Sequence, residues 1–217
     1  IVPSIMGETY MSKKTHDTLI KRVENDGATL VVTFNGGQYN EFEKVFGLKS
    51  NGYVKCTSLK TANFDFGKIH YTTQKEILCE SIGAEVLARN DEGNVVMAKN
   101  KLGKGVVYFL GFGIEEYALA QVDGFDTDVS EPFYKVYSIF GDKFKEKYFV
   151  TSENPHIGIT QSKCRCESGY VVTIINYSDK PVNPMLSFDN RKNYDFLYGN
   201  KESVPACDAV IIKVTED

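Results

Sequence analysis

A continuous run of β-branched and aromatic residues, Ala28–Phe34, is the feature that most constrains how this 217-residue chain folds. Because the run lacks alternation between apolar and polar side chains, it is typical of a parallel strand covered on both faces. A helical segment precedes it, with Ser12 able to cap its start and Gly27 placed for a left-handed stop. The apolar opening Ile1–Ile5 indicates another strand, so the order strand, helix, strand predicts a right-handed βαβ unit.

The following segment predicts more strands than helices. Helices are expected at Glu41–Phe46 and Glu131–Phe144, whereas short apolar alternations over residues 48–75 favour hairpins or loops. We expect three further strands, in chain order, at residues 84–89, 94–99 and 105–110. Turns rich in Gly, Asp and Lys separate these three strands, which predicts an antiparallel meander near the edge of the sheet.

The sequence changes character near residue 150. Beyond that point no helical periodicity remains, and short apolar strands alternate with turns rich in Asn, Asp, Gly and Pro. We therefore predict an α/β domain with a partly parallel sheet over residues 1–150. A small all-β domain of the sandwich type is expected over residues 151–217, with a linker at Thr151–Pro155.

Charge and cysteine content exclude several classes of protein. The chain has 25 Lys+Arg and 29 Asp+Glu, for a formal charge of -4, and no basic run that would favour nucleic acid or a membrane surface. No apolar stretch approaches the ~18 residues of a membrane span. Five irregularly spaced cysteines favour reduced thiols and a cytoplasmic location. The opening Ile1–Ser4 has no signal-peptide features, and it indicates a piece of a longer protein.

Several short motifs follow one another in an order known from one enzyme family. In chain order they are Val2-Pro-Ser4, Val23-Glu-Asn-Asp-Gly27, Ala28–Phe34, Val45–Leu48, Gly83–Ala88, Asn100–Phe109, Val172–Val182 and Tyr194–Gly199. Together they cover most of the chain and resemble the trimerisation domain and C-terminal β-domain of family 42 β-galactosidases. One departure is Tyr177, which stands where the family pattern has His.

The resemblance implies a flavodoxin-like domain, related to class I glutamine amidotransferases, followed by a β-sandwich. It also implies a homotrimer, and an upstream (β/α)8 barrel that carries the two catalytic glutamates of the parent enzyme. Two strands of the flavodoxin-like sheet would then precede Ile1. On that basis we expect Ile1–Ile5 to lie at a sheet edge, paired with a second copy or shielded by residues 48–75.

Residues suited to catalysis are sparse. An amidotransferase needs a nucleophile in a Gly-framed turn, but the turn at Asn35–Gln38 holds none, and Cys56 and Cys79 lie outside any such turn. The best carboxylate pair for glycoside hydrolysis is Glu115–Glu116. Adjacent acids at a helix start are better explained by the positive end of the helix dipole. We therefore assign no catalytic, cofactor-binding or metal-binding residue, and expect no cofactor.

Three motifs could suggest ion binding, but the sequence around each of them favours a structural role. Asp123, Asp126 and Asp128 lack the spacing and the trailing Glu of a calcium loop. Cys164 and Cys166 have no further Cys or His nearby in the sequence to complete a zinc site. Gly103-Lys-Gly105 predicts a hairpin turn rather than a phosphate loop, because no helix follows it.

Two classes of function remain open. The first is a non-catalytic oligomerisation and accessory region of a β-galactosidase-like glycoside hydrolase, reaching carbohydrate only through its parent. The second is a stand-alone amidotransferase-like enzyme or carbohydrate-binding module. Sugar-binding surfaces use exposed aromatic rings, and the chain has no Trp. The tyrosines considered for that role are Tyr10, Tyr39, Tyr53, Tyr71 and Tyr198.

Overall fold

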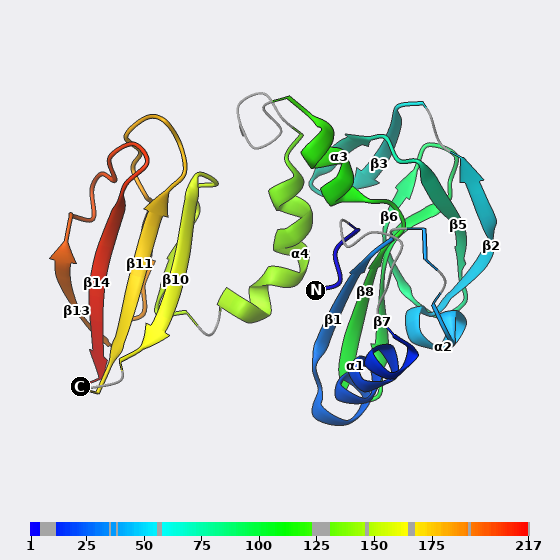
Figure 1. The fold of residues 1–217 in the computed structure, drawn as a ribbon, viewed down its shortest axis with the longest axis horizontal. Coiled ribbons are helices and arrows are strands. Elements are labelled where there is room, and N and C mark those ends of the chain that lie inside the picture. Colours follow the sequence, from blue (N-terminus) through cyan, green and yellow to red (C-terminus); the bar gives the residue numbers. More distant parts are fainter. Residues whose placement is uncertain are drawn as a thin grey trace. The chain divides into compact units, whose positions relative to one another are not determined.

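The computed structural model describes residues 1–4, 12–34, 36–37, 39–55, 58–122, 131–145, 148–164, 168–190 and 192–216. The chain divides near residue 136 into two compact units. The first unit contains α1 to α3 and β1 to β8, the second contains β9 to β14, and α4 spans the boundary between them (Figure 1).

The first unit is a mixed α/β structure. Its elements are α1 (Lys13–Asp26), β1 (Thr29–Thr33), α2 (Phe42–Phe46), β2 (Leu48–Lys55), β3 (Lys60–Phe64), β4 (Gly67–Tyr71), β5 (Lys75–Ser81), β6 (Glu85–Asn90), β7 (Val95–Leu102), β8 (Gly105–Leu110) and α3 (Ile114–Ala120). Helix α4 covers Phe133–Lys145. Six strands form one sheet in the order β1-β8-β7-β6-β3-β4, and β2 pairs with β5 in a separate two-stranded sheet.

The predicted start of the fold is confirmed in its helix and its second strand. Ser12 Oγ accepts a hydrogen bond from the Thr15 amide at 3.2 Å, and Gly27 ends α1 with a φ of 75°. Strand β1 follows, and four of its five residues are buried, as expected for a strand covered on both faces. It pairs in parallel with β8.

Two expectations about the sheet were wrong. The meander of β6, β7 and β8 lies in the middle of the sheet rather than near its edge, because the β3–β4 hairpin adds outside β6. The expected strand Ile1–Ile5 is reduced to one parallel bridge between Val2 and Val32 at the β1 edge, and Ile5 lies outside the described residues. No pairing of Val2 with β2, β3 or β4 occurs among the described residues.

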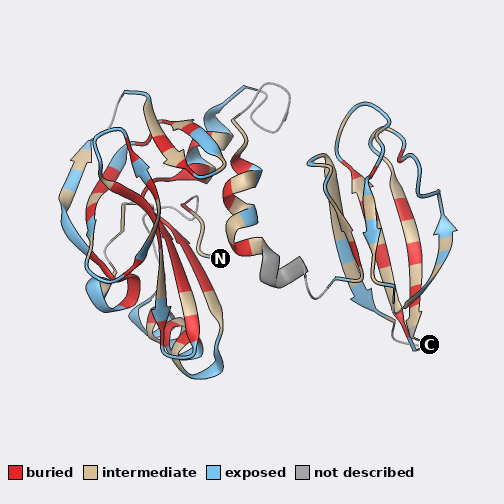
Figure 2. Cartoon of the chain, turned by 180° about the vertical axis from the view of Figure 1, so that it is seen from behind, coloured by how far each residue is buried: buried red, intermediate tan, exposed pale blue. Residues whose placement is uncertain are grey.

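The core of the first unit is formed by the main sheet, α1, α2 and the β2–β5 pair, and buried residues are red in Figure 2. Its buried side chains come from α1, α2, five of the strands and two residues beside strands: Ile20, Val23, Leu30, Val32, Phe34, Val45, Phe46, Leu48, Ile77, Cys79, Ala84, Val95, Ala98, Leu102, Val107 and Phe109. Phe109 of β8 contacts both Phe42 and Phe46 of α2, with ring centroids 5.3 and 4.6 Å apart. These aromatic contacts fix α2 on the sheet.

The Gly103-Lys-Gly105 segment is a hairpin turn, as predicted, and its glycines serve close packing. A Cβ on Gly105 would lie 2.2 Å from the Ala28 carbonyl oxygen, and one on Gly103 would lie 2.5 Å from that of Glu24. The Lys104 amide donates to the same Glu24 oxygen at 2.9 Å. The turn therefore packs against the last turn of α1 without space for side chains.

The second unit is all-β. Its strands are β9 (Val150–Ser152), β10 (Ile157–Lys163), β11 (Tyr170–Asn176), β12 (Leu186–Phe188), β13 (Lys192–Tyr198) and β14 (Ala209–Glu216). Four of them form an antiparallel sheet in the order β10-β11-β14-β13, and β9 pairs with β12. Thr151 and Ser152, which we expected in a linker, therefore belong to a strand, and β10 was not expected.

One face of this four-stranded sheet is the core of the second unit. Its fully buried residues alternate along β11 and β14 and are joined by residues from β9 and the loop before β14: Val150, Val172, Ile174, Val204, Val210, Ile212 and Val214. The intervening residues of β11 and β14, such as Ile175 and Ile211, point to the opposite face and are half-buried.

Candidate functional site

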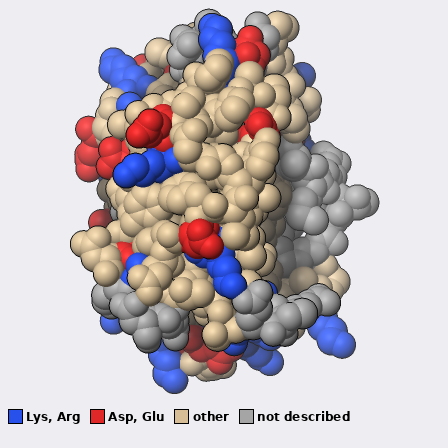
Figure 3. All heavy atoms as spheres, turned by 90° about the vertical axis from the view of Figure 1, so that its left-hand side faces the viewer, with Lys and Arg blue, Asp and Glu red and all other residues tan. Residues whose placement is uncertain are grey.

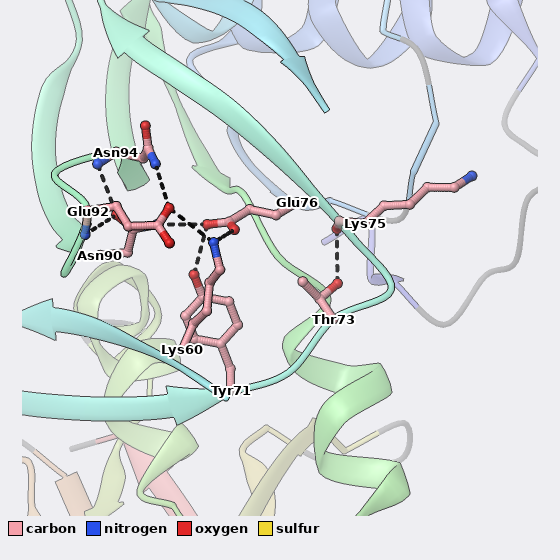
Figure 4. Close-up of polar contacts among 8 residues, drawn as sticks. All are labelled: Lys60, Tyr71, Thr73, Lys75, Glu76, Asn90, Glu92 and Asn94. Carbon is pink, nitrogen blue, oxygen red and sulfur yellow. Dashed lines mark hydrogen bonds and ion pairs between the residues drawn. The ribbon is translucent and has the colours of Figure 1, made fainter. Parts of the chain in front are cut away.

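A buried polar network is the most unusual feature of the first unit (Figure 4). Glu76 of β5 is 1% exposed, and its Oε1 accepts hydrogen bonds from Tyr71 Oη at 3.0 Å and Asn90 Nδ2 at 2.9 Å. Lys60 Nζ lies 2.6 Å from Glu76 Oε2 and 3.2 Å from Glu92 Oε2. Four strands or turns thus place their polar side chains around one carboxylate.

Each charged group of the network lies within ion-pairing distance of a group of opposite charge. Burial disfavours the Lys60 ammonium, but its hydrogen bonds to Glu76 and Glu92 outweigh this, and the pKa of Lys60 is raised above its usual value. Asn90 Oδ1 accepts from the backbone amides of Glu92 and Asn94, at 3.1 and 2.9 Å, and so shapes the β6–β7 turn. Tyr71 also stacks on Phe112, with ring centroids 3.8 Å apart.

Such an arrangement is suited to holding strands together rather than to chemistry. Both oxygens of Glu76 already interact with donors. The Glu76 carboxylate is also buried, so it cannot reach a substrate. No sequence pattern pointed to it, because Lys60 lies in the segment expected to form hairpins or loops, and Glu76 lies in a segment to which no element was assigned. Among the described residues, no three His, Cys, Asp or Glu side chains gather where they could hold a metal ion.

The expected carboxylate pair, Glu115 and Glu116, lies at the start of α3, as predicted. Glu115 Oε2 accepts hydrogen bonds from the Ser4 amide, Ser4 Oγ and Thr33 Oγ1, at 3.2, 2.7 and 2.8 Å. Burial, and then the charge of Glu115, raise the pKa of Glu116. One carboxylate therefore fastens residues 1–4 to β1 and α3, and the pair does not face two sides of a substrate site.

The cysteines show no catalytic geometry where they are described. Cys79 is 2% exposed, and burial followed by the nearby Glu76 charge raises its pKa to about 12. Such a thiol is not a nucleophile at neutral pH. Cys164 lies just after β10, Cys207 is exposed, and Cys56 and Cys166 lie outside the described residues. The aspartates considered for calcium, Asp123, Asp126 and Asp128, also lie outside them.

A pair of hydrogen bonds anchors the segment before α4 to the last strand of the main sheet. His70 Nδ1 of β4 lies 2.7 Å from Glu131 Oε1, and the His70 amide donates to Glu131 Oε2 at 3.1 Å. Both side chains are partly exposed, at 44% and 25%. The Glu131 carboxylate thus accepts a hydrogen bond from one backbone amide of an edge strand.

The five candidate tyrosines fall into different environments. Tyr71 is fully buried in the polar network, and Tyr39 packs edge-on against Phe46. Tyr53 is half exposed but stacks on Phe34, and Tyr10 lies outside the described residues. Tyr198 is exposed on the second unit. A further exposed tyrosine, Tyr177, was noted in the sequence only as a departure from a family pattern.

The molecular face in Figure 3 carries interspersed basic and acidic side chains around a broad uncharged area. No continuous basic patch is visible on that face. In the described part of the chain, no helix has the length and apolar character needed to cross a membrane.

No family model and no curated protein matches the amino-acid sequence. Solved structures do match the fold. A β-galactosidase from Rahnella sp. R3 aligns with 94% of this chain, at a TM-score of 0.66 and 14% identity. A GH42 β-galactosidase from G. stearothermophilus aligns with 94%, at 0.61 and 15%, and an α-L-fucosidase from Paenibacillus thiaminolyticus with 97%, at 0.62 and 12%.

This chain spans only 31% and 30% of the two β-galactosidase chains and 40% of the α-L-fucosidase chain. The matches run through nearly all of the present chain and through a minor part of each neighbour. The chain therefore has a fold found within larger glycoside hydrolases, and GH42 β-galactosidases are among those neighbours.

Proposed function

We propose that this chain is the non-catalytic oligomerisation and accessory region of a β-galactosidase-like glycoside hydrolase. The observation that carries the proposal is the coverage of the structural neighbours. They align with 93–94% of this chain but only 30–31% of the β-galactosidase chains, so the remaining 70% or so of such an enzyme has no counterpart here. The catalytic barrel would belong to that remainder.

The first unit is proposed to be a flavodoxin-like variant that mediates self-association. Support comes from the parallel arrangement of Val2, β1 and β8, which is the part of the sheet that a flavodoxin-like order would share. A trimer is the state that the family resemblance favours. The second unit is proposed to be a β-sandwich formed by its four-stranded sheet and the β9–β12 pair.

A non-catalytic role agrees with the chemistry of the described residues. Retaining glycosidases need two carboxylates about 5 Å apart across a bound sugar. Glu115 is held by Ser4 and Thr33, and Glu76 is closed in its network, so neither is available for such a pair. A cytoplasmic location completes the proposal, because reduced thiols suit the odd number of cysteines.

Two measurements test the proposal. Sedimentation velocity over a range of protein concentrations should show a trimer of the 217-residue chain, and a strictly monomeric species at all concentrations would contradict the oligomerisation role. Assays with nitrophenyl β-galactoside and α-fucoside should show no turnover. Turnover that disappears in Glu115→Gln or Glu116→Gln would overturn the non-catalytic assignment.

A further inference from the structure

Two exposed tyrosines stand on the open face of the four-stranded sheet in the second unit. Tyr177 is 70% exposed and Tyr198 is 52% exposed. Tyr198 pairs with Ile211, whose neighbour Ile212 points into the core, so Tyr198 lies on the face away from the core. Tyrosine rings are enriched at interfaces, so two exposed rings on one sheet face can serve as a binding surface.

The Tyr177 ring packs on the sheet at a glycine, Gly158. A Cβ added to Gly158 of β10 would lie 2.4 Å from Tyr177 Cε2 and 3.0 Å from its hydroxyl oxygen. The ring therefore rests directly on the β10 backbone, at a point where any side chain would displace it. The Tyr177 amide also donates to the His156 carbonyl oxygen at 3.0 Å. The ring is held in place while most of its surface faces solvent.

The Asp208 carboxylate lies next to the Tyr198 ring. Tyr198 Oη donates to Asp208 Oδ2 at 3.1 Å, and the Ala209 amide donates to Asp208 Oδ1 at 2.7 Å. An ionised carboxylate accepts about four hydrogen bonds. Asp208 is half-buried, so it is both oriented by these two donors and able to accept from a ligand.

A buried amide joins the two turns that carry these groups. Asn176 is 1% exposed, and its Nδ2 lies 2.7, 3.1 and 2.9 Å from the carbonyl oxygens of Lys180, Val204 and Pro205. Its backbone amide donates to the Asp208 carbonyl oxygen at 2.9 Å. The turn after β11 and the turn before β14 are thus fixed to each other before any ligand arrives, which lowers the cost of binding.

The strand register places an apolar floor between the two rings. Gly158 pairs with Ile175, and Ile175 pairs with Ala209, in three adjacent strands. With strands about 4.8 Å apart, the seat of Tyr177 and the backbone beside Asp208 lie roughly 10 Å from each other across this floor. The surface therefore offers two aromatic rings and an apolar strip, with one hydrogen-bond acceptor at its far side.

We propose that this face binds a neutral oligosaccharide, with Tyr177 and Tyr198 stacking on pyranose rings and Asp208 accepting hydrogen bonds from their hydroxyl groups. A pyranose ring presents apolar C–H groups on its faces and hydroxyl donors around its rim, which is the complement of this surface. The carboxylate of Asp208 disfavours an anionic ligand. The inference goes beyond the proposed function and does not depend on the oligomeric state of the chain.

The test is a titration of the ¹⁵N-labelled 217-residue chain, followed by amide chemical shifts. The probes are β-1,4-galactotetraose, cellotetraose and maltotetraose at millimolar concentration, since the sugar is to be identified. At least one should shift the amides around Gly158, Tyr177 and Asp208 in a saturable way. Tyr177→Ala and Tyr198→Ala should each weaken binding about tenfold, as expected for the loss of one stacking ring.

Two further variants separate ring stacking from general damage. Tyr177→Phe keeps the ring and should bind with little change, whereas Gly158→Ala should weaken binding by displacing the ring. The matched control is Tyr148→Ala, which removes a 39% exposed tyrosine of the same unit and should have no effect. Amide spectra outside the site should be unchanged in every variant.

Three outcomes would overturn the proposal. They are the absence of shifts with all three sugars, an equal loss of affinity in Tyr148→Ala, and shifts of the Tyr177 and Tyr198 amides with protein concentration alone. The last result would mean that a second copy covers this face. A monomeric chain that binds sugar would contradict only the oligomerisation role, and a trimer that does not bind would contradict only this inference.

Discussion

Glu115 Oε2 accepts two hydrogen bonds from Ser4, one from its amide at 3.2 Å and one from its hydroxyl at 2.7 Å, although 111 residues separate them in the chain. The contact holds residues 1–4 against the start of α3. We expect Glu115→Gln to lower the free energy of unfolding by about 1–2 kcal/mol, because hydrogen bonds to a charged acceptor are stronger than those to an amide. Urea unfolding measures this.

Glu116→Gln is the matched control for that variant. Burial and the charge of Glu115 raise the pKa of Glu116, so its ionised form is less favourable in the folded chain than in the unfolded one. This cost is present at neutral pH and disappears as the pH falls below the ordinary value of 4.5. Glu116→Gln should therefore stabilise the chain slightly at pH 7. A loss of stability equal to that of Glu115→Gln would show that the Ser4 contact is not the cause.

Lys60→Met should be strongly destabilising, because it leaves the carboxylate of Glu76 buried without its cation. The expected loss is about 3–5 kcal/mol in urea unfolding. The double variant Lys60→Met/Glu76→Leu should recover much of it. Lys99→Met removes a solvent-exposed pair with Glu85 and should cost about 1 kcal/mol or less. Equal effects of the two lysine variants would contradict the role of burial.

The same pair predicts a loss of stability at high pH. The pKa of Lys60 is raised in the folded chain, so the pair contributes fully below the ordinary value of 10.5 and is lost as the pH rises through the folded-state pKa. The free energy of unfolding, measured from pH 8 to 12, should fall less steeply in Lys60→Met/Glu76→Leu than in the native chain. Parallel curves for the two proteins would argue against this linkage.

Cys79 should resist alkylation in the native chain. Its burial and its pKa of about 12 leave almost no thiolate at neutral pH, whereas Cys207 is exposed. Iodoacetamide labelling mapped by mass spectrometry should modify Cys207 first and Cys79 only on unfolding. Fast labelling of Cys79 at pH 7 would reopen a nucleophilic role for this thiol.

Gly105→Ala should destabilise the first unit by about 1–3 kcal/mol, as expected for overpacking. Its Cβ would lie 2.2 Å from the Ala28 carbonyl oxygen and 2.6 Å from that of Val23. Gly83→Ala is the control, because nothing lies within 4 Å of the added Cβ. If thermal unfolding shows the same midpoint for both variants, the turn has more space than the contacts indicate.

The parts of the fold that could be predicted are those set by local sequence. Ser12 and Gly27 delimit α1 because capping depends on neighbouring residues, and β1 could be recognised from an unbroken apolar run. Strand β5 was missed because a charged residue, Glu76, occupies one of its buried positions. That placement is stable only with Lys60, which comes from another strand. The position of the meander likewise depends on the β3–β4 hairpin, because the local pattern predicted hairpins or loops over residues 48–75 but not the pairing of β3 with β6.

The candidate sites follow the same division. The location of Glu115 and Glu116 at a helix start could be predicted from the sequence, because adjacent acids there are a local pattern, whereas the contacts of Glu115 with Ser4 and Thr33 could not. The surface around Tyr177 could not, because Gly158 and Asp208 approach it only through the pairing of β10, β11 and β14. Neither Tyr177 nor Gly158 alone indicates a binding surface; only their contact in the folded chain does.

The hydrogen bonds between His70 and Glu131 also affect how a second copy of the chain could pair with this sheet. Strand β4 ends the main sheet, and one of its amides is already taken by the Glu131 carboxylate. A second copy that added a strand there would have to displace this acid. The contact therefore disfavours edge-to-edge pairing of two copies along β4.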